Sequence, residues 1–127
     1  MKIGFYIQWN KYSLENHSGN VIGDELLAES YCKYLRKIPE IEDAQLYAPN
    51  YRPESKLDVM VYMNPIEPVK EFSDINVLYV QNGFEYNVHS LTRNKGFQGY
   101  IFFSQKLLDL VRQHGAGRDF FSRLALI

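Results

Sequence analysis

The feature that most constrains the fold is a short apolar run followed at once by a long amphipathic segment. Residues 3–7 (IGFYI) are rich in β-branched and aromatic side chains, which predicts a buried strand. From about Val21 apolar residues recur at helical spacing: Ile22, Leu26, Leu27, Tyr31, Tyr34, Leu35 and Ile38. Most charged residues of this segment, Asp24 and Glu25 among them, fall on the other face. A strand that leads into such a helix predicts a parallel α/β sheet.

Local signals set the expected ends of this helix. Asn20 is suited to the N-cap, and Pro39 predicts a stop. Acidic residues lie in the first turns and basic residues in the last turn, which the helix dipole favours.

Further apolar runs predict four more strands, at residues 44–48, 57–63, 75–80 and 100–103. We also expect a weak helical turn over 65–72, and a second amphipathic helix that runs from Ser104 and is ended by Gly115. The predicted fold is a single Rossmann-like, three-layer α/β domain with a mostly parallel sheet of about five strands. The link over 49–56 has only eight residues, so it is either a tight crossover or the sign of an antiparallel edge strand.

Composition limits the class of protein. The 127 residues are 46% apolar, with a net charge of −1, which predicts one globular domain over residues 1–127 and disfavours a nucleic-acid binder. The tail at 116–127 is expected to be a cut into a linker or a following domain. Cys32, the one cysteine, is expected to be a buried filler in the helix. No metal-ligand spacing, signal peptide or membrane-spanning run is visible, which favours a cytoplasmic protein.

Uncharged polar residues follow the predicted strands, where an open parallel sheet binds its ligands. They are Gln8, Trp9, Asn10, Asn64, Gln81, Asn82 and Ser104. Carboxamides both donate and accept hydrogen bonds, and the indole of Trp9 can stack on a sugar ring, so this rim predicts a neutral polyhydroxylated ligand. The alternative is that Asn and Ser stand there as turn and cap residues, and that Trp9 caps the core.

The loop before the helix is a second candidate for ligand binding. Ser18, Gly19 and Asn20 allow close approach to the backbone, although they match neither a dinucleotide nor a phosphate-loop fingerprint. His17 and Glu85 are weak acid–base candidates, and simple surface positions are the alternative for both.

The order of these pieces resembles the N-terminal half of GT-B glycosyltransferases. The resemblance is carried by MKIGFYIQW, SGNVIGDELLAESYCKYL, KLDVMVYMNP, INVLYVQNGF and GYIFFSQKLLDLV, over roughly residues 1–114. It implies an acceptor-binding domain, with the nucleotide-sugar donor bound by a second domain or subunit and no cofactor in this chain. Many members have His where Gln81 and Asn82 stand. Because a carboxamide is no general base at neutral pH, these two are weak catalytic candidates and a retaining reaction remains open.

Three hypotheses follow for the function. The leading one is the acceptor-binding half of a glycosyltransferase that acts on a carbohydrate or glycolipid, in the cytoplasm or at the inner face of a membrane, and that is inactive as an isolated chain. The alternative is a non-catalytic Rossmann-like module that binds a protein or a ligand. A small complete hydrolase or other enzyme is the third.

Overall fold

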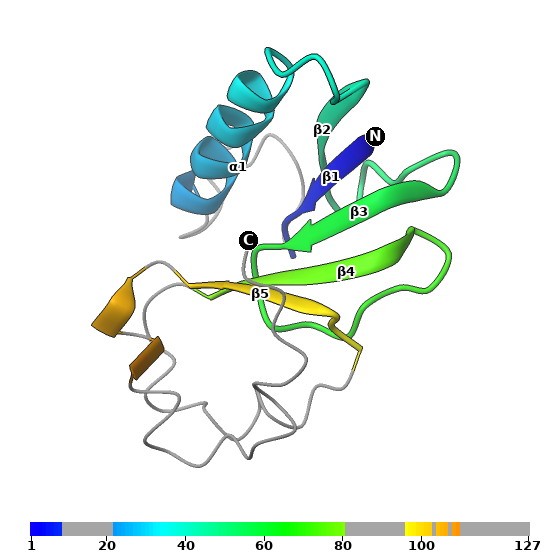
Figure 1. Cartoon of the computed structure of the whole chain (residues 1–127). Helices are drawn as coiled ribbons and strands as arrows, with labels where there is room; N and C mark the ends of the chain where they lie inside the picture. Colours follow the sequence, from blue (N-terminus) through cyan, green and yellow to red (C-terminus); the bar gives the residue numbers. More distant parts are fainter. Residues whose placement is uncertain (9–21, 81–95, 103, 107, 110–127) are drawn as a thin grey trace.

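The computed structural model describes residues 1–8, 22–80, 96–102, 104–106 and 108–109. Within these ranges the chain forms five strands and one helix in the predicted order, and the α/β class is confirmed (Figure 1). The elements are β1 (Lys2–Tyr6), α1 (Ile22–Leu35), β2 (Asp43–Tyr47), β3 (Leu57–Tyr62), β4 (Ser73–Val80) and β5 (Gly99–Phe102). None of the helical segments described is long and apolar enough to cross a membrane.

The sheet is entirely parallel, with the strand order β2-β1-β3-β4-β5. The antiparallel alternative for an edge strand is therefore wrong, and the link between β2 and β3 is a tight crossover. This crossover turns sharply at its start, where Ala48 and Tyr51 exchange backbone hydrogen bonds of 3.0 and 2.9 Å. The order is that of a doubly wound Rossmann-like domain, with its reversal point between β1 and β3.

Helix α1 covers one face of the sheet over β1 and β2, and its buried side chains are small. Ala28 and Cys32 are fully buried there, which confirms the role expected for Cys32. The predicted apolar face was partly wrong, because Leu26 is 53% and Tyr34 65% exposed, while Glu25 is only 5% exposed. The apolar residues of this helix span more than one face: the sheet buries Ala28 and Cys32 fully and covers Leu27, Tyr31 and Leu35 in part.

Aromatic side chains cover the opposite face of the sheet, which we call the aromatic face. Its buried cluster contains Tyr6, Tyr47, Tyr62, Phe72, Phe97 and Tyr100. Neighbouring rings lie with their centroids between 5.6 and 5.9 Å apart, as in the Tyr6–Tyr62 and Phe97–Tyr100 pairs. Packing thus accounts for most of the aromatic residues described, as expected.

The segment between β3 and β4 lies on the aromatic face. Of the helical turn predicted over 65–72, only a hydrogen-bonded turn at its end is present, where the backbone N–H of Phe72 donates to the carbonyl of Val69 at 3.1 Å. Pro68 has no backbone N–H and disfavours the helical conformation of the residue before it. The backbone N–H of Val69 instead donates to the Tyr62 hydroxyl at 3.0 Å, which anchors this segment to the sheet. After β5, residues 105–106 and 108–109 are helical, as predicted for the start of the second helix.

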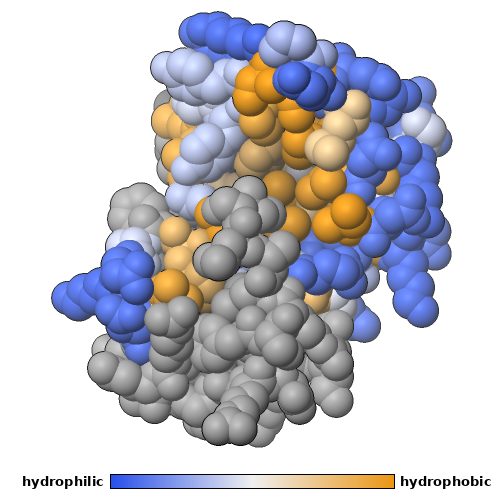
Figure 2. All heavy atoms as spheres, in the orientation of Figure 1, coloured by the Kyte–Doolittle hydropathy of each residue, from blue (hydrophilic) through white to orange (hydrophobic). Residues whose placement is uncertain are grey.

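A row of apolar side chains crosses the other face beside α1. Ile3, Val59 and Ile75 are paired in register on β1, β3 and β4, and Ile75 is 45% exposed. Figure 2 shows apolar atoms gathered on the surface beside the helix.

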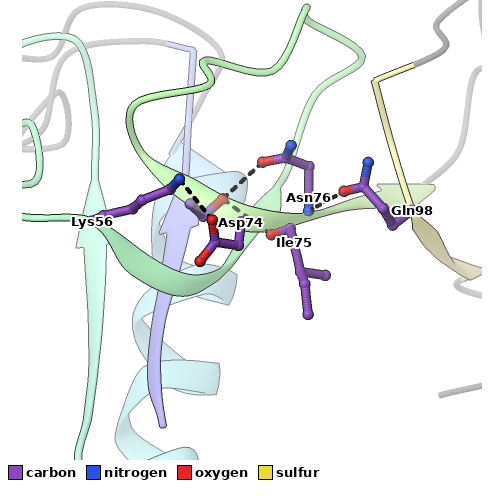
Figure 3. A network of polar contacts seen from close by, with 6 residues as sticks. Lys56, Asp74, Ile75, Asn76 and Gln98 are labelled. Atoms are coloured by element: carbon purple, nitrogen blue, oxygen red, sulfur yellow. Dashed lines mark hydrogen bonds and ion pairs between the residues drawn. The ribbon is translucent and has the colours of Figure 1, made fainter.

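Polar groups join β4 to the segment before β5 at the edge where the strands begin, which we call the amino edge (Figure 3). The hydroxyl of Ser73 donates to Asn76 Oδ1 at 2.7 Å, and the backbone N–H of Asn76 donates to Gln98 Oε1 at 2.7 Å. Ser73 and Asn76 are buried, and these contacts fix the register of β5 against β4.

Candidate functional site

The strands all end at one edge of the sheet, which we call the carboxyl edge. Its reversal point lies between β1 and β3, where the connections leave toward opposite sides and a crevice can form. Gln8 follows β1 at this point, and Asn64 follows β3. The sequence placed candidate ligand-binding residues at this same point of the sheet.

Asn64 connects three elements at the reversal point. Its Oδ1 accepts a hydrogen bond of 3.3 Å from the backbone N–H of Gln8, and its Nδ2 donates to Asp24 Oδ2 at 3.2 Å. Asp24 lies in the first turn of α1, where the helix dipole favours an acidic side chain. One carboxamide thus links the end of β1, the end of β3 and the beginning of the helix.

The register of the two central strands produces this arrangement. Tyr6 pairs with Tyr62 at the ends of β1 and β3, and the backbone N–H of Met63 donates to the carbonyl of Tyr6 at 2.9 Å. Because β1 and β3 stay in register up to this bond, Gln8 and Asn64 lie at equivalent positions just beyond the two strand ends.

Ser104 lies near the same edge, two residues beyond β5. Two strand spacings separate β5 from β3, which is about 10 Å along the edge. The backbone N–H of Gln8 and the side chain of Asn64 are thus in contact, whereas Ser104 is two strand spacings from Asn64 and three from Gln8. The remaining predicted residues lie outside the described part of the chain: Trp9, Asn10, His17, Ser18, Gly19, Asn20, Gln81, Asn82 and Glu85.

Asp24 is the site residue that sequence reasoning missed. We expected it on the outer face of the helix, but it faces the carboxyl edge and accepts from Asn64. An acidic residue in the first turn after a strand–loop–helix connection was the available signal, because that turn lies at the edge where ligands bind.

Two tyrosines lie between α1 and β4 near this edge. The hydroxyls of Tyr31 and Tyr79 are 2.9 Å apart, and their rings pack edge to face. Burial raises the pKa of Tyr79 above its usual value, and the hydrogen bond to Tyr31 raises it further. The Tyr79 hydroxyl is consequently neutral at pH 7 and acts as a hydrogen-bonding group, not as a base.

The chemistry of this edge suits a ligand rich in hydroxyl groups. Gln8, Asn64 and Ser104 offer uncharged donors and acceptors, and Asp24 offers a carboxylate. An anionic ligand such as a phosphate would meet the charge of Asp24 without a cation among these four residues. The described residues also contain no cluster of three or more metal-ligating side chains.

No protein-family model, curated protein or solved structure matches the chain.

Proposed function

We propose that the carboxyl edge binds a neutral, polyhydroxylated ligand, and that the chain is the acceptor-binding half of a GT-B-like glycosyltransferase. In this proposal a second domain or subunit binds the nucleotide-sugar donor, and the acceptor is a carbohydrate or a glycolipid headgroup. The enzyme acts in the cytoplasm, at the inner face of a membrane where the acceptor is lipid-linked.

The observation that carries the proposal is the Asn64 carboxamide at the reversal point of the sheet. Its bonds to Gln8 and Asp24 are 3.3 and 3.2 Å long, at the upper end of the range for hydrogen bonds. Asn64 is half-buried, so a ligand hydroxyl can exchange with these contacts at small cost. Asp24 beside it can accept a hydrogen bond from a sugar hydroxyl, and a charged acceptor strengthens such a bond.

The first experiment is a titration of the ¹⁵N-labelled chain with methyl α-D-glucopyranoside and methyl α-D-mannopyranoside, followed by NMR. We expect weak, saturable shifts in the amide signals of Gln8, Asp24 and Asn64. Asn64→Ala should remove these shifts. The control, Gln98→Ala, removes a carboxamide from the amino edge and should leave them unchanged.

Two outcomes would contradict the proposal. One is the absence of saturable shifts at the carboxyl edge with either glycoside. The other is tight binding of UDP-glucose by this chain that is weakened in Asn64→Ala, since the proposal assigns the donor to another domain.

A second candidate is a non-catalytic Rossmann-like module that binds a protein or another ligand. It is favoured by the fact that both polar atoms of the Asn64 carboxamide already have partners within the chain. Under this alternative, Asn64→Ala leaves glycoside titrations unchanged.

A further inference from the structure

A cavity of about 220 Å³ lies between strand β2 and the tight crossover that follows it. Tyr47 and Leu57 are buried at its base, and Asp43 and Gln45 of β2 form one wall. The crossover over 51–55 lies along the cavity. The cavity is on the aromatic face, away from Asn64.

The base of the cavity depends on a glycine in the neighbouring strand. A Cβ atom on Gly4 of β1 would lie 2.6 Å from Leu57 Cδ1 and 2.9 Å from Tyr47 Cδ2. These two side chains therefore approach each other over β1 only because residue 4 has no side chain.

Four charged side chains line this cavity, two of each sign: Lys2, Arg52, Asp43 and Glu54. None of the four forms an ion pair with another residue in the described part of the chain. Opposite charges thus line one small cavity without a direct ion pair between them.

Lys2 is paired in register with Asp43, so Arg52 is the cation that can lie apart from the carboxylates. Burial raises the pKa of the Tyr47 hydroxyl, and the nearby carboxylates of Asp43 and Glu54 raise it further, so the negative side is close to Tyr47. On the positive side, the guanidinium of Arg52 lies over the ring of Phe72, 5.2 Å from its centroid. A stacking ring of this kind holds a guanidinium in place.

Hydrogen bonds preorganise the negative wall. The Tyr51 hydroxyl donates to Gln45 Oε1 at 3.2 Å, and Gln45 Nε2 donates to Asp43 Oδ2 at 2.6 Å. The rings of Tyr47 and Tyr51 stack with their centroids 5.6 Å apart. The carboxylate of Asp43 is thereby fixed in direction before any ligand arrives, which lowers the entropy cost of binding.

We propose that this cavity binds a small zwitterion, an amino acid whose ammonium group lies between Asp43 and Glu54 and whose carboxylate meets Arg52. The volume sets the size of the ligand. At about 30 Å³ for a water-sized group, the cavity holds roughly seven heavy atoms. γ-Aminobutyrate has this size and carries its charges at opposite ends.

The proposal is tested by calorimetric or NMR titration of the full chain with γ-aminobutyrate, n-butylamine and butyrate, which share their length and differ in charge. We expect γ-aminobutyrate to bind at least about fivefold more tightly than either singly charged probe, since each charge adds a contact. Glu54→Gln should weaken the binding of γ-aminobutyrate and of butylamine. Arg52→Gln should weaken the binding of γ-aminobutyrate and of butyrate. Both residues are exposed, so these variants should fold.

The control is Glu29→Gln, which replaces an exposed carboxylate of α1 outside the cavity. It should leave the affinity for all three probes unchanged. Equal affinity for the three probes, the absence of saturable binding, or affinities unaffected by Glu54→Gln and Arg52→Gln would overturn the assignment. The result is independent of the proposed glycosyltransferase function, because Asn64→Ala should leave γ-aminobutyrate binding intact.

Discussion

The two edges of the sheet carry similar amide side chains and use them differently. At the amino edge, Asn76 is 8% exposed, and its Oδ1 accepts a hydrogen bond of 2.7 Å from Ser73 while its Nδ2 donates to the carbonyl of Gly96 at 3.4 Å. Its backbone N–H also donates to Gln98 Oε1 at 2.7 Å. At the carboxyl edge, Asn64 is half-buried, and its two contacts are 3.2 and 3.3 Å long. A short, buried hydrogen bond is costly to break, whereas a longer one near water is exchanged easily. The comparison indicates that the first amide stabilises the fold and that the contacts of the second are easier to exchange.

The largest loss of stability is expected for a substitution at Gly4, which lies in β1 between the two edges of the sheet. Gly4→Val places new atoms against Leu57, Tyr47 and Met60, whose Sδ would lie 2.7 Å from the Cβ atom. We expect a loss of about 3 kcal/mol in the free energy of unfolding, at the upper end for overpacking in a core. Urea unfolding followed by circular dichroism measures this loss.

Lys2→Val is the matched control, because it adds the same side chain to an exposed position of the same strand. A loss below about 0.5 kcal/mol for Gly4→Val, the ordinary range of surface substitutions, would show that β1 is not tightly packed between the edges.

The two edges also differ in how far the sequence predicts them. The polar residues after the strands were found because strand ends are visible as the end of an apolar run, and an entirely parallel sheet places them at one edge. The backbone N–H of Gln8 meets the Asn64 side chain there. The Ser73–Asn76–Gln98 network was not predicted, since Asn76 and Gln98 are far apart in sequence and no local pattern specifies their pairing. Asp24 was missed although its position in the first turn of α1 was an available signal.

The cavity beside the tight crossover was also invisible in the sequence. Its walls come from the middle of β2 and from an irregular segment, and only the crossing of these two parts brings Asp43 and Arg52 to one place. Hydrophobic periodicity specifies the elements and their faces, but it carries no information on where a connection passes over the sheet.

The second prediction compares the two asparagines directly. Asn76→Ala should cost about 1.5 kcal/mol in the free energy of unfolding, because it removes a buried amide and its bond to Ser73. Asn64→Ala should cost less than about 0.5 kcal/mol, since water can replace its long contacts. Both losses are measured by urea unfolding at one pH. Equal losses at the two edges would remove the distinction between a structural and an available amide.

The smallest effect is expected at the amino edge itself, in the ion pair between Lys56 and Asp74 (Figure 3). Their charged atoms are 2.6 Å apart, but the side chains are 53% and 70% exposed. We expect a coupling energy of at most about 0.5 kcal/mol, because water screens exposed charges. A double-mutant cycle with Lys56→Met and Asp74→Asn measures it, and about 1 M NaCl should abolish it. The coupling energy of Lys56 and Asp74 could instead exceed that of the buried Ser73–Asn76 pair. Burial would then not explain why some polar groups stabilise the fold and others can bind a ligand. The assignment of Asn64 to a ligand site would then lose its physical basis.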